Sequence, residues 1–383
     1  MILLQIFVFL LVITAIVVAH ELGHYLFARW RGMEVEEFCI LGLPVGRRFV
    51  LGRTRSGMEI TMHPFMPLGG FVKIKGMEPR PDASETRIEG GFYSKGLGSR
   101  ALVLFGGPLF SILFGWFVLF LTLWAFGDAR PAKEPVIGAV LEKYKDPETK
   151  QEMFSPAYKA GLREGDKLIS VDGKPISNFY DFLVVTRSSP GKTLKVVVER
   201  DGKRLTLSLE PVLRENMMII GPDGDPELNP DGTLKRGNVG WIGALYKIER
   251  VDVGFRESAY LATKRSWQVI INTYGTIINW RRVADEVGGP ISIGQIVGGA
   301  VQSGVETIAT VTALISLSIG LINLLPVPMI FDGGHLLVVL IEALRGGKRL
   351  SFKTQEMLSR VGIAMLAFLL ISVLFLDVKR IFD

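Results

Sequence analysis

The chain has 383 residues, 48% of them hydrophobic, and a formal net charge of +6. With a positive mean hydropathy, this composition excludes an ordinary soluble protein, and the length allows a membrane core plus a separate domain. The basic residues fall beside the apolar runs, which favours cytoplasmic loops over a nucleic-acid-binding surface, so we expect no nucleic-acid partner. The single cysteine, Cys39, excludes an internal disulfide and a cysteine-rich zinc site.

The first predicted element is an apolar run from Met1 to Ala19, which leads into His-Glu-Leu-Gly-His at residues 20–24. We interpret it as an uncleaved membrane span, because it has no positive n-region and no small-residue cleavage site. On a helix, His20 and His24 project from one face and can bind one metal ion, while Glu21 can reach a water molecule there. Ionisable groups at membrane depth are costly and usually functional. The pattern therefore indicates zinc-assisted hydrolysis with Glu21 as the general base.

A basic loop separates this span from the second apolar run, Leu102 to Phe126. The positive-inside rule places the loop in the cytoplasm and the N-terminus outside. Within it, Met58 to Lys75 is predicted to form two strands joined by Pro-Leu-Gly-Gly, a β-hairpin whose apolar side chains could enter the membrane part. An ordinary solvated hairpin is the alternative.

Residues 135–212 have the composition of a soluble α+β domain. A short helix is predicted from Ser155 to Leu162, and strands are predicted at 136–140, 167–171, 194–199 and 204–209. Residues 214–238 are rich in Gly, Pro, Asp and Asn, which predicts a loop or linker. Phe255 to Trp280 mixes apolar and charged residues, which fits helices on the outer membrane surface better than a span.

Two further spans are predicted, Glu306 to Leu325 and Met357 to Leu376. With four spans, the first and third run in the same direction, so His20 and the residues around Asp332 should share a depth of roughly 30 Å along their helices. Asp332 is the acidic residue nearest this depth and is the natural third metal ligand. His335 is its competitor, and Asp332 could instead only cap the next helix.

Several motifs along the chain resemble those of one family. They are His20-Glu21-Leu22-Gly23-His24, Gly69-Gly70-Phe71-Val72-Lys73, Phe105-Gly106-Gly107-Pro108, Ser155 to Ile176, Gly288-Gly289-Pro290-Ile291, Asn323 to Pro328 and Asp332-Gly333-Gly334-His335. The chain resembles the site-2 protease family of intramembrane zinc metalloproteases, specifically the bacterial regulator-of-sigma-E protease type with an embedded PDZ domain.

The resemblance implies a role for each matching residue. His20, His24 and Asp332 would be the zinc ligands and Glu21 the catalytic base. Asn323 and Pro326 would belong to the substrate-binding region. Gly69 and Gly70 would lie in a membrane-associated β-loop that pairs with the substrate strand.

The expected fold is a polytopic α-helical membrane protein with about four transmembrane helices, a membrane-associated β-hairpin and an inserted α+β PDZ domain. Its parts would be 1–134 with the first two spans, 135–212 as the PDZ domain, 213–304 as linker and membrane-surface amphipathic helices, and 305–383 with the last two spans.

The expected function is zinc-dependent intramembrane cleavage of single-pass membrane proteins, which by resemblance include anti-sigma-factor-like proteins and remnant signal peptides. The PDZ domain would bind an extended peptide or a C-terminus by strand addition. The protein would be a multi-pass protein of the bacterial inner membrane. Its N-terminus and PDZ domain would lie on the periplasmic side, and its active site near the cytoplasmic side.

One departure from the family pattern lies between Pro328 and Asp332, where this chain is one residue longer. A displaced Asp332 would favour an alternative function, a non-catalytic PDZ-bearing membrane scaffold or holdase with a defective metal site. A metal transporter is a third interpretation. It would need a polar path across the membrane, whereas the polar groups here gather at one depth.

Overall fold

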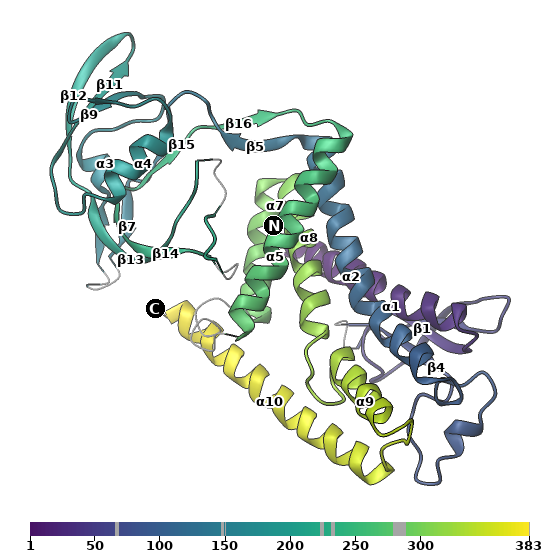
Figure 1. Ribbon diagram of the computed structural model, residues 1–383. Helices are drawn as coiled ribbons and strands as arrows, with labels where there is room; N and C mark the ends of the chain where they lie inside the picture. The colour runs from purple at the N-terminus through teal and green to yellow at the C-terminus, as the bar shows by residue number, and fades with distance from the viewer. Residues whose placement is uncertain are drawn as a thin grey trace. The chain divides into compact units, whose positions relative to one another are not determined.

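The computed structural model describes residues 1–65, 69–146, 149, 151–222, 226–230, 234–278 and 289–382. These residues form two compact units, the first made of 1–125 and 255–383 and the second of 126–254. The spans lie in the first unit, and the segment expected to be an inserted domain lies in the second (Figure 1).

Among the described residues, four helices are long and apolar enough to cross a membrane, which confirms the prediction of a polytopic α-helical membrane protein. They are α1 (Ile2–Trp30), α2 (Leu97–Phe126), α8 (Val305–Asn323) and α10 (Phe352–Phe382). Lipid offers backbone groups no hydrogen-bond partners, so apolar segments of this length satisfy those groups internally as helices.

The described part of the first unit also contains the helices α5 (Phe255–Ile278), α7 (Pro290–Ser303) and α9 (Asp332–Leu344). The first half of α5 runs antiparallel beside α2. The Phe255 ring contacts the Trp124 ring, and Trp116 Nε1 donates to Thr263 Oγ1 at 3.0 Å. The membrane-surface location of this helix stays a prediction, and Trp280 and Gly288 lie outside the described residues.

A four-stranded sheet follows α1. Its strands are β1 (Val35–Leu41), β2 (Phe49–Arg53), β3 (Glu59–Met62) and β4 (Phe71–Ile74), in the order β2-β3-β1-β4. Both strands of the predicted hairpin therefore exist, but the hairpin itself is wrong. The strand β1 lies between them, parallel to β3 and antiparallel to β4. Each of the two strands pairs with β1 instead of with the other. Two residues of the predicted turn, Pro67 and Leu68, lie outside the described residues.

Two short 3₁₀ helices, η1 (Ser84–Arg87) and η2 (Phe92–Ser94), connect this sheet to α2. A buried apolar cluster joins the sheet, η2, α2 and α9 through residues that include Phe38, Phe92, Leu104 and Val339. The packing of α9 against this cluster brings residues from the end of the chain to the histidine-bearing part of α1.

The second unit is built around a mixed α/β core. Its elements are β5 (Asp128–Pro131), β6 (Ile137–Val140), β7 (Lys143–Lys145), β8 (Glu152–Phe154), α3 (Pro156–Lys159), β9 (Lys167–Val171), β10 (Lys174–Pro175), α4 (Phe179–Arg187), β11 (Leu194–Arg200), β12 (Lys203–Leu209), β13 (Val212–Met218), β14 (Arg236–Trp241), β15 (Ala244–Tyr246) and β16 (Ile248–Val251). The main sheet has the order β10-β9-β11-β12, and the predicted strands and short helix of 135–212 are present.

The linker expected from residue 213 onward is wrong over residues 213–218 and 236–251, where the chain forms strands. Strands β13 and β14 pair there, β15 pairs with β6, and Ile242 lies in the same buried core as Phe182. Composition predicted a loop or linker over 214–238, and the described residues between β13 and β14 form no helix. It could not reveal that the flanking residues return to complete the domain, because that pairing depends on residues about a hundred positions away.

Candidate active site

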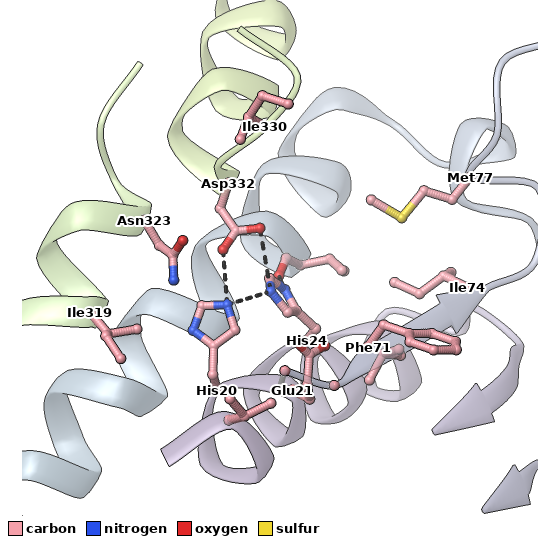
Figure 2. A pocket seen from close by; sticks show the side chains of 15 residues that line it. His20, Glu21, His24, Phe71, Ile74, Met77, Ile319, Asn323, Ile330 and Asp332 are labelled. Carbon is pink, nitrogen blue, oxygen red and sulfur yellow. Dashed lines mark hydrogen bonds and ion pairs between the residues drawn. The ribbon is translucent and has the colours of Figure 1, made fainter. Parts of the chain in front are cut away.

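The two histidines of α1 lie one turn apart and face the same point. Their rings meet edge to face, and His20 Nε2 lies 3.3 Å from His24 Nε2 (Figure 2). This is the arrangement that the four-residue spacing predicts for one helix face.

The third donor comes from the first residue of α9. Asp332 Oδ2 lies 3.1 Å from His20 Nε2, and Asp332 Oδ1 lies 3.4 Å from His24 Nε2. Both carboxylate oxygens of Asp332 therefore face ring nitrogens of the two histidines. A deprotonated carboxylate is the form that ligates a metal.

The donor set fits zinc. Among the described residues, His20, His24 and Asp332 form a group of side chains that could hold a metal ion, and their ligand atoms lie within 4.8 Å of one another. Ligands about 2.05 Å from a tetrahedral zinc ion lie about 3.3 Å apart, which agrees with the three separations of 3.1, 3.3 and 3.4 Å. His335 does not belong to this group, so the third donor is Asp332 and not His335.

Residues of α2 orient both imidazole rings. His24 Nδ1 lies 2.8 Å from the carbonyl oxygen of Val103, which can only accept, so the neutral ring donates there and turns an unprotonated Nε2 toward Asp332. His20 Nδ1 lies 2.9 Å from Ser111 Oγ. Such outer partners fix the tautomer and orientation of metal-binding histidines.

Glycines bring α1 and α2 close enough for these contacts. A Cβ on Gly106 would lie 2.7 Å from the backbone oxygen of Gly23. A Cβ on Gly107 would lie 2.3 Å from His24 Nε2 and 2.7 Å from His20 Nε2. The small residues of the Phe-Gly-Gly-Pro stretch thus permit the close approach of the two helices and leave room for the histidine rings.

The extra residue before Asp332 is accommodated in the loop between α8 and α9. Met329 adopts a left-handed backbone conformation with φ of 56°. The first turn of α9 packs tightly on this loop, because a Cβ on Gly334 would lie 1.9 Å from the Val327 oxygen and one on Gly333 would lie 2.1 Å from the Leu324 oxygen. Asp332 still reaches the histidines, so the scaffold interpretation loses its only support in the sequence.

A cavity of about 340 Å³ opens beside the three donors. Glu21, Asn323, Gly69 and Gly70, for which the resemblance implies catalytic or substrate-binding roles, line this cavity, whereas Pro326 is not among its lining residues. Other lining residues were not identified from the sequence: Val17, Phe71, Val72, Ile74, Met77, Val103, Ile319 and Ile330. They are apolar, so nothing in their chemistry distinguishes them from ordinary core or lipid-facing residues.

Comparison with known proteins extends over nearly the whole chain. Residues 8–369 match Peptidase family M50. A protein of Rhizobium meliloti (strain 1021) that is named as a zinc metalloprotease is 31% identical over 98% of this chain and 96% of its own length. The regulator of sigma E protease of Salmonella typhi is 29% identical over 97% of this chain and 98% of its own length. The expected resemblance is therefore confirmed, and the chain belongs to peptidase family M50, the site-2 protease family of zinc metalloproteases.

Proposed function

We propose that this multi-pass zinc metalloprotease of the inner membrane cuts single-pass membrane proteins within or next to their transmembrane segments. The observation that carries the proposal is the position of His20 and His24 on the apolar helix α1, with Asp332 of α9 beside them. His20 is the nineteenth residue of α1, which places it about 27 Å from the helix start at about 1.5 Å per residue. The hydrocarbon core is about 30 Å thick, so the cavity opens near one membrane surface.

In the proposed mechanism, His20, His24 and Asp332 hold the metal. Zinc bound there supplies Lewis-acid polarisation of the scissile carbonyl and acidifies water. Glu21 lines the cavity beside the donors, where its carboxylate takes a proton from the attacking water and delivers it to the leaving amine. Asn323, the last residue of α8, also lines the cavity, and its amide can hydrogen-bond the substrate backbone.

The strand β4 offers a place for the substrate backbone. It ends the sheet order of the described strands, and Phe71, Val72 and Ile74 line the cavity. Gly70 lets this strand approach α1, since a Cβ there would lie 2.8 Å from a Val17 methyl group. A helical substrate hides its carbonyl groups, so an unwound segment that adds to the edge of β4 would expose them to attack. This strand would act as the membrane-associated β-loop.

We also propose that the second unit is the PDZ domain and that it binds an extended peptide or a C-terminus. A mostly apolar cavity of about 230 Å³ lies between α4 and the residues that lead into β15, and Phe179, Leu183 and Leu245 line it. Strand β15 pairs with β6 along one edge, and a peptide strand could add along the other.

The proposed orientation follows the positive-inside argument. The N-terminus and the PDZ domain would be periplasmic, and the active site would lie near the cytoplasm. Anti-sigma-factor-like proteins and remnant signal peptides are the proposed substrates.

The proposal is tested by cleavage of a tagged single-pass membrane reporter by the purified protein in detergent, beside Glu21→Gln. This variant keeps all three donors and removes only the base, so its zinc content should equal that of the wild type. We expect a fragment cut within the membrane segment from the wild type alone. Cleavage by both proteins at equal rates would show that Glu21 is not the base. Cutting only outside the membrane segment would contradict the intramembrane proposal.

A further inference from the structure

A buried ion pair joins the helix that orients His24 to the helix that carries Asp332. Arg100 of α2 donates from Nη2 to Glu342 Oε2 of α9 at 2.8 Å, and the two side chains are 5% and 0% exposed. The other carboxylate oxygen of Glu342 accepts from the backbone N–H of Leu350 at 3.2 Å. Charges removed from water this completely are costly unless they are paired and hydrogen-bonded, so this geometry is held firmly.

A second ion pair extends the same network. Arg349 lies 2.8 Å from Glu85 of η1, whose side chain is 1% exposed. The Arg349 guanidinium lies 3.9 Å from the centre of the Tyr93 ring, and the Arg100 guanidinium lies 5.2 Å from it. Two cations and two anions therefore balance around one aromatic ring and fix the end of α9 to the segment before α2.

The chain positions of this pair relate it to the metal donors. Arg100 lies one turn before Val103, whose carbonyl oxygen accepts from His24. Glu342 lies near the C-terminal end of α9, and Asp332 opens the same helix, about 15 Å away at about 1.5 Å per residue. A helix of this length is stiff. Anchoring its far end therefore restrains the position and direction of its first residue.

We propose that Arg100 and Glu342 are positioning residues that set the location of Asp332 relative to His20 and His24. The inference rests on the proposed function, in which these three residues hold zinc. Neither partner touches the cavity, and both act through the placement of α9 against α2. Asp332 lies more than 300 residues from the histidines in the chain. The ion pair helps to hold it at the distance from them that a shared metal ion requires.

The test measures the zinc dissociation constant of the purified full-length protein in detergent by competition with a chromophoric chelator. Glu342→Gln keeps the side-chain shape and removes the negative charge. Arg100→Gln removes the positive charge and shortens the side chain, and the double variant removes both charges. We expect each single variant to raise the dissociation constant about tenfold, the lower limit of what the loss of a direct hydrogen-bond partner of a metal ligand costs. The double variant should bind zinc no more weakly than the weaker-binding single variant, because the two residues act as a unit.

Asp166→Asn is the matched control. Asp166 is a fully buried carboxylate paired with Arg200 at 2.7 Å in the second unit. Its loss should lower the melting temperature without changing the zinc dissociation constant. If the Gln variants lower the melting temperature in the same way while zinc affinity stays at the wild-type value, the pair is only structural and the inference is overturned.

Two further variants separate the remaining outcomes. Glu342→Asp keeps the charge but shortens the side chain by one methylene, so it should fold even if the Gln variants do not, and it should still weaken zinc binding. Asp332→Asn tests the proposed function in the same assay. Equal zinc affinity for this variant and the wild type would overturn both proposals, whereas weakened binding by Asp332→Asn alone would overturn only the positioning role.

Discussion

Replacing Gly107 with alanine should damage the metal centre while leaving the helix intact. The added Cβ would lie 2.3 Å from His24 Nε2 and 2.7 Å from His20 Nε2, and ordinary contacts begin near 3.4 Å. The His24 ring must therefore move by about 1.1 Å, the difference between 3.4 and 2.3 Å. Alanine is a better helix former than glycine by about 1 kcal/mol, so intrinsic helix stability changes in the opposite direction.

We expect the geometric effect to dominate activity. A displacement of about 1 Å at a reacting centre can cost about 100-fold in rate, and the moved ring also loses its alignment with the Val103 carbonyl oxygen. The measurements are the cleavage rate of a single-pass reporter and the zinc content after dialysis. We expect cleavage to fall about 100-fold and zinc to be partly lost, with an unchanged helical signal by circular dichroism.

Gly98→Ala provides the matched control on the same helix. No atom lies within 4 Å of a Cβ built on Gly98, so this variant should retain wild-type zinc content and activity. The reasoning is refuted if Gly107→Ala retains full zinc and cleaves at the wild-type rate, because the space behind the histidines would then not be limiting.

Three further predictions concern the partner of His20, the dependence on metal and the core of the second unit. Ser111→Ala should weaken zinc binding about tenfold by removing the partner of His20 Nδ1. The control is Ser316→Ala, which removes a buried hydroxyl that donates to the Ser111 carbonyl oxygen; equal zinc affinity in the two variants would count against the orienting role of Ser111. Chelation should abolish cleavage of the reporter. Added zinc should restore cleavage in the wild type but only weakly in Asp332→Asn, as measured at increasing zinc concentration. Full restoration in Asp332→Asn would mean that another residue completes the site. Phe182→Ala, in the core of the second unit, should lower its free energy of unfolding by about 3–5 kcal/mol and leave zinc affinity unchanged; a loss of zinc in the folded variant would contradict this separation.

Local patterns in the sequence were sufficient to predict the membrane helices and two of the three metal donors, His20 and His24. Spans are long apolar runs, and their hydropathy does not depend on what they pack against. The geometry of His20, Glu21 and His24 follows from the helical repeat alone. In the second unit, the strands predicted at 194–199 and 204–209 pair in the structure, and Asp201 and Gly202 in the turn between them have positive φ.

Contacts between distant residues decided the rest. The alternation of residues around Gly69 and Gly70 predicts two strands, but only the folded chain places β1 between them, because a parallel pairing leaves no turn signal in the sequence. Parity of the spans brought Asp332 to the correct depth, yet whether an additional loop residue would displace it depended on the backbone of Met329 and on the packing of Gly334. Ser111 and the Val103 carbonyl oxygen could not be recognised in advance, since a serine and a peptide group become partners of a metal-binding histidine only through the distance at which two helices pack.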